Sequence, residues 1–124
     1  MGNLNIDQEI MDGSKSVYDY WQDQMPLNVA EECGELIKAV SKLERAKSKY
    51  EREHAAQFFE PIDWLDLDKN TEEVPLAQKV HRQKRKVIDE MGDVILSILS
   101  ISHRYGIDPS DIDLRIREKI SEKR

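Results

Sequence analysis

The stretch DEMGDVI, residues 89–95, places carboxylates and a glycine inside what otherwise has the apolar pattern of a buried helix. An earlier stretch, EECGELI at residues 31–37, repeats the order acid, glutamate, sulfur residue, glycine, acid, aliphatic residue, isoleucine. Glycine in a helix interior costs roughly 1 kcal/mol relative to alanine. Two copies of the same costly pattern therefore point to a shared site and not to two unrelated helix surfaces.

Apolar residues around both stretches recur at spacings of three and four, which predicts two long helices with core-facing stripes. The first begins near Pro26 and extends to about residue 50, with a continuation to 59 as the alternative, and the second covers about 76–105, followed by Gly106 as the C′ residue. The expected stripes are Val29, Cys33, Leu36, Ile37, Val40 and Leu43 in the first, and Val80, Val87, Ile88, Met91, Val94, Ile95, Ile98, Leu99 and Tyr105 in the second.

The remaining sequence adds shorter helices and one long break. Amphipathic pieces are expected at about 4–11 and 14–24, with Ser14 as the N-cap of the second, and a last helix is expected after the N-cap Asp108. Prolines and alternating acids predict a long loop at about 58–76. The sequence therefore predicts one all-α domain, residues 1–124, folded as an antiparallel four-helix bundle.

The acids of the two stretches predict a metal site. Positions three apart share a helix face, so Glu32 neighbours Glu35 and Glu90 neighbours Asp93, each pair at the edge of an apolar stripe. If the helices pack antiparallel, the four carboxylates converge and require a cation. Oxygen ligands without His or Cys favour Mg²⁺, with Mn²⁺ as the alternative, and such sites leave positions open for water and phosphates. A single pair of acids three residues apart on a helix is most often part of a solvent-exposed face. Here the matching glycines and apolar neighbours in both stretches favour the metal site.

The composition limits which classes of partner and which cellular setting are expected. The net charge of −6 argues against a nucleic-acid polymer as ligand, because no basic face dominates. The single cysteine, Cys33, is read as a small core residue and favours a reducing, cytoplasmic setting. The N-terminus lacks the pattern of a signal peptide, and the longest apolar run, at 94–101, is too short to cross a membrane.

These motifs carry a resemblance to a known family. EECGE (31–35) followed by EMGD (90–93) resembles the EExxE and ExxD motifs of the MazG-like, all-α nucleoside triphosphate pyrophosphohydrolase superfamily. SHRYGID (102–108) is similar to the end of the family's second motif helix, and DLRIREKI (113–120) is similar to its last helix. The resemblance covers about residues 17–124.

The resemblance implies a helical bundle completed by oligomerisation, as a homodimer or homotetramer. It implies Mg²⁺-dependent hydrolysis of a (deoxy)nucleoside triphosphate to the monophosphate and diphosphate, for house-cleaning of nucleotide pools. Non-canonical nucleotides and the dCTP or dUTP pools both remain open as substrates. The family's metal ligands correspond to Glu32, Glu35, Glu90 and Asp93, and Glu31 is expected to orient a ligand or activate water.

Two features depart from the family pattern. The interval 36–89 is longer than usual, and two asparagines of many relatives are replaced, one by His103 and one near the end by Ser121 or Glu122. The candidate substrate-binding residues are Lys38, His103, Lys119 and Trp21, with solvated lysines, a surface histidine and a core aromatic as the alternatives. The basic run HRQKRK (81–86) is interpreted as a solvated face. The alternative function is a catalytically silent helical module that binds a nucleotide or a partner protein.

Overall fold

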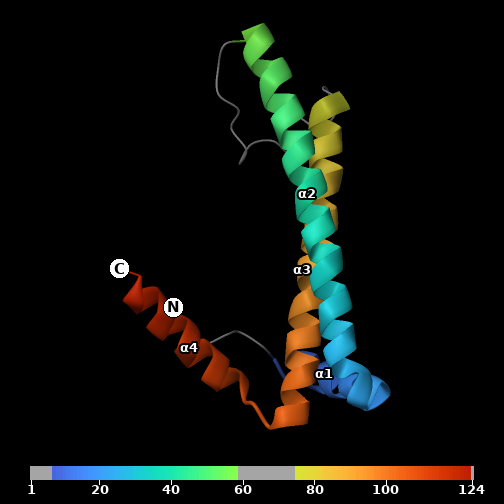
Figure 1. Ribbon diagram of the computed structural model, residues 1–124, viewed down its shortest axis with the longest axis vertical. Helices are drawn as coiled ribbons and strands as arrows, with labels where there is room; N and C mark the ends of the chain where they lie inside the picture. Colours follow the sequence, from blue (N-terminus) through green and yellow to red (C-terminus); the bar gives the residue numbers. More distant parts are fainter. Residues whose placement is uncertain (1–6, 59–74, 124) are drawn as a thin grey trace. The chain divides into compact units, whose positions relative to one another are not determined.

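The computed structural model describes residues 7–58 and 75–123, and all the regular secondary structure of these residues is helical (Figure 1). The elements are α1 (Gln8–Trp21), a single 3-10 turn η1 (Gln22–Gln24), α2 (Met25–Phe58), α3 (Pro75–Tyr105) and α4 (Pro109–Glu122). The all-α prediction is confirmed for these residues. Most of the expected loop at about 58–76 lies outside them, and its two edges, Phe58 and Pro75, belong to helices.

The chain forms two compact units, one of residues 1–32 and 93–124 and one of residues 33–92. One boundary falls inside α2 and the other inside α3, so each of these long helices contributes residues to both units. The units are described one at a time below.

Unit 33–92 is held together by a small core between α2 and α3. Ala46 and Tyr50 of α2 pack with Ala77 and Val80 of α3, and Leu43 packs against this cluster. Alanine side chains leave room for the two backbones to approach each other, and the tyrosine fills the remaining space. Leu43 and Val80 belong to the expected stripes, whereas the other three residues were not expected in the core.

In the unit of residues 1–32 and 93–124, α1 is tied to the end of α3 through His103. Its Nε2 lies 2.8 Å from Oγ of the buried Ser14, and its ring stacks on Tyr18 with 6.4 Å between centroids. The Ser14 hydroxyl also donates a hydrogen bond to the Met11 carbonyl at 2.8 Å.

The N-terminal helix differs from the prediction made from the sequence. Within the described residues, α1 joins the two expected pieces, 4–11 and 14–24, as far as Trp21, where the turn η1 follows, and Ser14 lies in the interior of α1. The N-cap is Asp7, whose carboxylate accepts a hydrogen bond from the Ile10 backbone N–H at 2.9 Å. A serine is favoured at N-caps, but here the contact of the buried Ser14 with His103 of α3 decides its place.

The turn between α3 and α4 follows the expected chemistry. Gly106 has φ +63°, and the Ile107 N–H donates to the Ser102 carbonyl at 3.0 Å, the hydrogen bond of a Schellman motif. Asp108 is the N-cap of α4, and hydrogen bonds from the backbone and side chain of Ser110 lower the pKa of its carboxyl group. Gly106 and Asp108 are confirmed as helix-ending and helix-starting residues.

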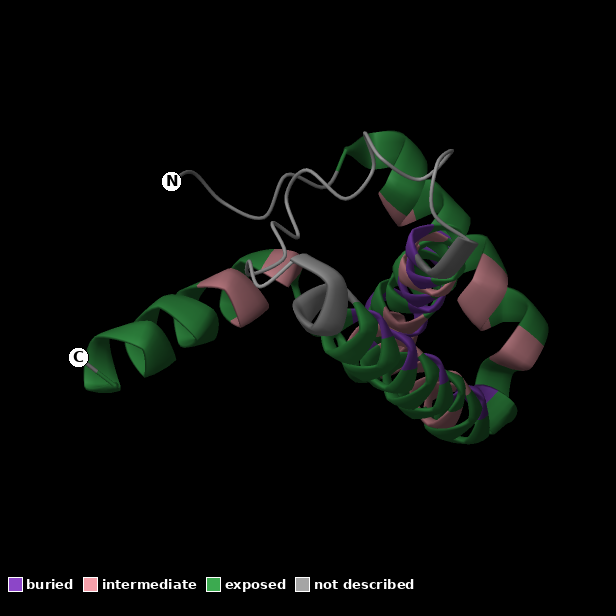
Figure 2. Cartoon of the chain, turned by 90° about the horizontal axis from the view of Figure 1, so that it is seen from above, coloured by how far each residue is buried: buried purple, intermediate pink, exposed green. Residues whose placement is uncertain are grey.

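Many residues of the expected stripes are exposed in the single chain (Figure 2). On α3, Ile88, Met91, Ile95 and Ile98 recur at spacings of three and four and are 40–57% exposed, so they form an apolar stripe that the chain does not bury. The assignment of this set to the core was wrong for one chain, because periodicity identifies an apolar face without identifying what covers it. Ile37, Val40 and Tyr105 are exposed as well.

We expect Gly106→Ala to lower the free energy of unfolding by about 1 kcal/mol, because alanine is strained at positive φ. Gly13, inside α1, is the matched control: an added Cβ meets no atom within 4 Å there, so Gly13→Ala should raise stability by about 0.5–1 kcal/mol. Urea denaturation followed by circular dichroism measures both. Equal effects of the two substitutions would contradict the assigned turn.

Candidate functional site

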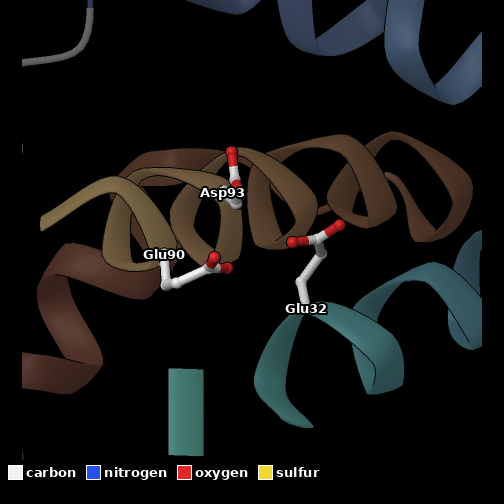
Figure 3. Close-up of side chains that lie close together, drawn as sticks. All are labelled: Glu32, Glu90 and Asp93. Atoms are coloured by element: carbon white, nitrogen blue, oxygen red, sulfur yellow. The ribbon is translucent and has the colours of Figure 1, made fainter. Parts of the chain in front are cut away.

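Three of the expected carboxylates lie together. Glu32 of α2 and Glu90 and Asp93 of α3 each offer one oxygen, and these oxygens are all within 4.8 Å of one another (Figure 3). Glu32 and Asp93 belong to the same unit, and Glu90 precedes Asp93 by one turn of the continuous helix α3. We call this set the acidic cluster. Among the described residues no other group of three or more His, Cys, Asp or Glu side chains has this spacing.

A buried hydrogen bond fixes the two helices one turn away from the acidic cluster. Ser97 Oγ donates to Asn28 Oδ1 at 2.7 Å, and both side chains are buried. Asn28 precedes Glu32 by four residues and Ser97 follows Asp93 by four, so the bonded pair lies one turn along each helix from an acid. The sequence analysis did not identify this pair. A polar residue one turn before the first motif was the available signal.

Glu90 is the buried member of the acidic cluster and has a cationic partner on its own helix. The residue is 5% exposed, and Lys86 Nζ lies 2.8 Å from its Oε1. The hydrogen bond to Glu90, followed by the charge of Glu90, raises the pKa of the Lys86 ammonium group. Lys86 therefore offsets one of the negative charges in the acidic cluster. Sequence reasoning assigned it no role beyond the basic run 81–86.

The other two acids of the first motif lie outside the acidic cluster. Glu35 is exposed and pairs with Lys38, with 3.5 Å between its Oε1 and the lysine Nζ. Glu31 is exposed as well. The structure thus brings together three of the four expected metal ligands and leaves Glu35 one turn along α2 from Glu32.

A family model, that of the MazG nucleotide pyrophosphohydrolase domain, matches residues 22–124. The chain belongs to this family. No curated protein and no solved structure gives a significant match. Membership implies a nucleotide pyrophosphohydrolase, a hydrolase with a nucleotide substrate, and the match confirms the resemblance to the MazG-like family.

The acidic cluster fits the divalent metal on which MazG enzymes generally depend. Its donors are all carboxylate oxygens, the ligand type of Mg²⁺ and Mn²⁺, without the His or Cys that would favour zinc. Exposure rises from the buried Glu90 through the half-buried Glu32 to the exposed Asp93, so one side of the cluster is open to a ligand.

The two glycines of the motifs are not required by packing within the described chain. An added Cβ at Gly34 or Gly92 would meet no atom within 4 Å. Neither glycine therefore makes room for a close neighbour within the described residues of a single copy. Ala39 and Ser97, the small residues one turn further on, are both buried.

The candidate substrate-binding residues lie in different places. Lys38 pairs with Glu35, and Lys119 of α4 lines a shallow hollow of about 380 Å³ with Ile112 and Ile116. Trp21 ends α1, half-buried, with Tyr20 edge-on at 5.7 Å between ring centroids.

His103 turns its ring to α1, where it contacts Ser14 and Tyr18. Its neighbour Arg104 binds Asp23 at 2.8 Å, which raises the pKa of the guanidinium group through the hydrogen bond. No helix of the described segments combines the length and the apolar character needed to cross a bilayer.

We expect Ser97→Ala to lower the free energy of unfolding by about 1–3 kcal/mol, because it leaves the buried Asn28 amide oxygen without its donor. Ser100→Ala is the matched control. Ser100 is equally buried, but its hydroxyl donates to the Leu96 carbonyl, which keeps its helical hydrogen bond, so the loss should stay below about 0.5 kcal/mol. Thermal and urea unfolding would show the difference, and equal losses would contradict the role given to the pair.

Proposed function

We propose that the chain hydrolyses (deoxy)nucleoside triphosphates to the monophosphate and diphosphate with Mg²⁺, and that Mn²⁺ can replace Mg²⁺. The observation that carries the proposal is the acidic cluster in a chain of the MazG family. Mg²⁺ bound there would neutralise the charge of the phosphates and of the leaving diphosphate. Water attacks the α-phosphorus, the bond between the α-phosphorus and the bridging oxygen breaks, and diphosphate leaves.

Glu32, Glu90 and Asp93 are the proposed metal ligands, and Glu35 is the proposed fourth. The contact between Glu35 and Lys38 is exposed, and exposed ion pairs contribute only about 0–1 kcal/mol, so Glu35 can leave its lysine at little cost. Lys38 would then be available to a phosphate oxygen.

Glu31, exposed beside Glu32, is proposed to orient the attacking water and to accept its proton. His103, Lys119 and Trp21 remain proposed substrate contacts. The contacts that His103 already makes with α1 favour an indirect part for it, in which it holds the helix that ends in Trp21. The setting proposed is cytoplasmic, where nucleotide pools need house-cleaning.

We further propose that a second copy of the chain completes the helical bundle, as a homodimer or, with two such pairs, a homotetramer. Ile88, Met91, Ile95 and Ile98 form an exposed apolar stripe of the kind that marks a protein interface. Light scattering tests this directly, and a native chain that stays monomeric at high micromolar concentration would contradict it.

We expect diphosphate release from a panel of canonical and modified nucleoside triphosphates to require Mg²⁺ and to fall at least about 100-fold in Glu90→Gln, because a metal ligand is lost. Asp89→Asn is the matched control. It removes the same charge from the exposed neighbouring residue, outside the acidic cluster, and should keep nearly full activity.

A coupled assay for diphosphate measures both variants against the native chain. If the folded native protein releases diphosphate from none of the triphosphates, the proposal fails and the silent binding module replaces it. If Asp89→Asn loses as much activity as Glu90→Gln, the site assignment fails.

A further inference from the structure

A basic furrow runs between α2 and α3 in the unit of residues 33–92. Its main hollow has a volume of about 710 Å³, and a second hollow of about 350 Å³ shares Lys42 and Gln83 with it. Eight lysines and arginines line the two hollows together, against only two acids, Glu35 and Glu44. We call this the basic furrow. The described part of this unit, residues 33–58 and 75–92, carries eleven Lys and Arg against six Asp and Glu, whereas the sequence of the whole unit, 33–92, carries twelve of each.

The basic side chains form two facing rows. Lys38, Lys42, Arg45, Lys49 and Arg52 follow each other at spacings of four and three on α2, which places them on one helix face over about 21 Å. The opposite row on α3 consists of Lys79, Arg82 and Lys86. The hollow that contains Arg52 also contains Lys79, and the hollow that contains Lys38 also contains Lys86, so the rows are antiparallel.

Most of these charges lack a counter-charge in the described part of the chain. Among the described residues, Lys42, Arg45, Lys49, Arg52 and Lys79 form no ion pair. Like charges one turn apart on a helix destabilise it, so this row works against folding. A ligand with several negative charges would relieve the repulsion.

The basic furrow offers charge and little else. Tyr50, the aromatic residue nearest the α2 row, is 9% exposed and belongs to the core, so it presents no ring on which a nucleobase could stack. Between residues 41 and 53 and between 77 and 87 no large hydrophobic side chain is exposed, and the exposed Ile37 and Val40, on either side of Lys38 in the sequence, line neither hollow. These described segments therefore lack the apolar contacts that would hold a peptide or a second copy, and the arginine forks and lysine ammonium groups suit phosphate oxygens.

We propose that the basic furrow binds a linear chain of phosphoanhydride-linked phosphates. The length of the α2 row and its lack of base-binding features favour a chain of several phosphates over a single one. Inorganic polyphosphate and the phosphate chain of a nucleotide share this chemistry. The ligand binds to residues outside the acidic cluster, so binding needs neither Mg²⁺ nor hydrolysis.

The test is calorimetric titration of the full-length protein in EDTA with orthophosphate, tripolyphosphate, a longer inorganic polyphosphate and a nucleoside triphosphate. The furrow variant is Arg45→Gln/Lys49→Gln, and Lys42→Gln/Arg52→Gln is a second one. The matched control is Arg85→Gln/Lys123→Gln, which removes two exposed positive charges from residues outside the furrow. Circular dichroism confirms that each variant is helical.

We expect affinity to rise from orthophosphate to the longer polyphosphate, and to fall about tenfold or more in either furrow variant but less than about twofold in the control. Each lost phosphate contact should also reduce the salt dependence of binding by about one unit of slope. Tighter binding of tripolyphosphate than of the nucleoside triphosphate assigns the inorganic chain as ligand, and the reverse order assigns the nucleotide-borne chain. The proposal would be overturned if the protein bound none of these phosphate ligands, or if the control variant lost as much affinity as the furrow variants.

A further variant separates this proposal from the hydrolytic one. Asp93→Asn should keep full affinity for polyphosphate in EDTA, because Asp93 belongs to the acidic cluster and not to the furrow. Loss of binding in Asp93→Asn together with retention in both furrow variants would move the phosphate site to the acidic cluster and overturn the inference.

Discussion

Three carboxylates whose oxygens lie within 4.8 Å of one another repel each other unless a proton or a cation stands among them. Glu90 is buried, so water screens its charge poorly, and Lys86 supplies one positive charge from the helix turn before it. We propose that a divalent cation supplies further positive charge among the three acids, and the exposed Asp93 leaves one side of the cluster open for the phosphates that such a cation would carry. The proposed chemistry rests on this arrangement.

The rest of the described structure holds the acids in place. The hydrogen bond between Ser97 and Asn28 fixes α3 against α2 one turn from Glu32 and Asp93. At the end of α3, His103 fixes α1 through Ser14. Both contacts join polar side chains, and a buried or half-buried polar pair is satisfied in only one register of the two helices. The charges are also separated along the helices: the acidic cluster lies at the motifs, and the basic furrow begins beside Glu35 and continues away from Glu32 along α2.

The residues of the acidic cluster could be predicted from the sequence more completely than the packing of the helices. Helix periodicity and the repeated acid and glycine pattern were enough to select Glu32, Glu90 and Asp93 as neighbours, and Gly106 and Asp108 marked the turn before α4. These features depend on residues close in sequence. Asn28 meets Ser97 across 69 positions and Ser14 meets His103 across 89, and no local pattern reports such pairs. The apolar stripe of α3 was placed in the core because periodicity cannot tell a surface buried by the same chain from one left for another.

The central claim, that the acidic cluster binds a divalent cation, is tested most directly by titrating Mn²⁺ into the nucleotide-free protein and following the free ion by electron paramagnetic resonance. The account predicts saturable binding by the native chain, with affinity at least about tenfold weaker in Asp93→Asn and unchanged in Asp89→Asn. Binding that is absent from the native chain, or equally strong in Asp93→Asn and the native chain, would contradict it.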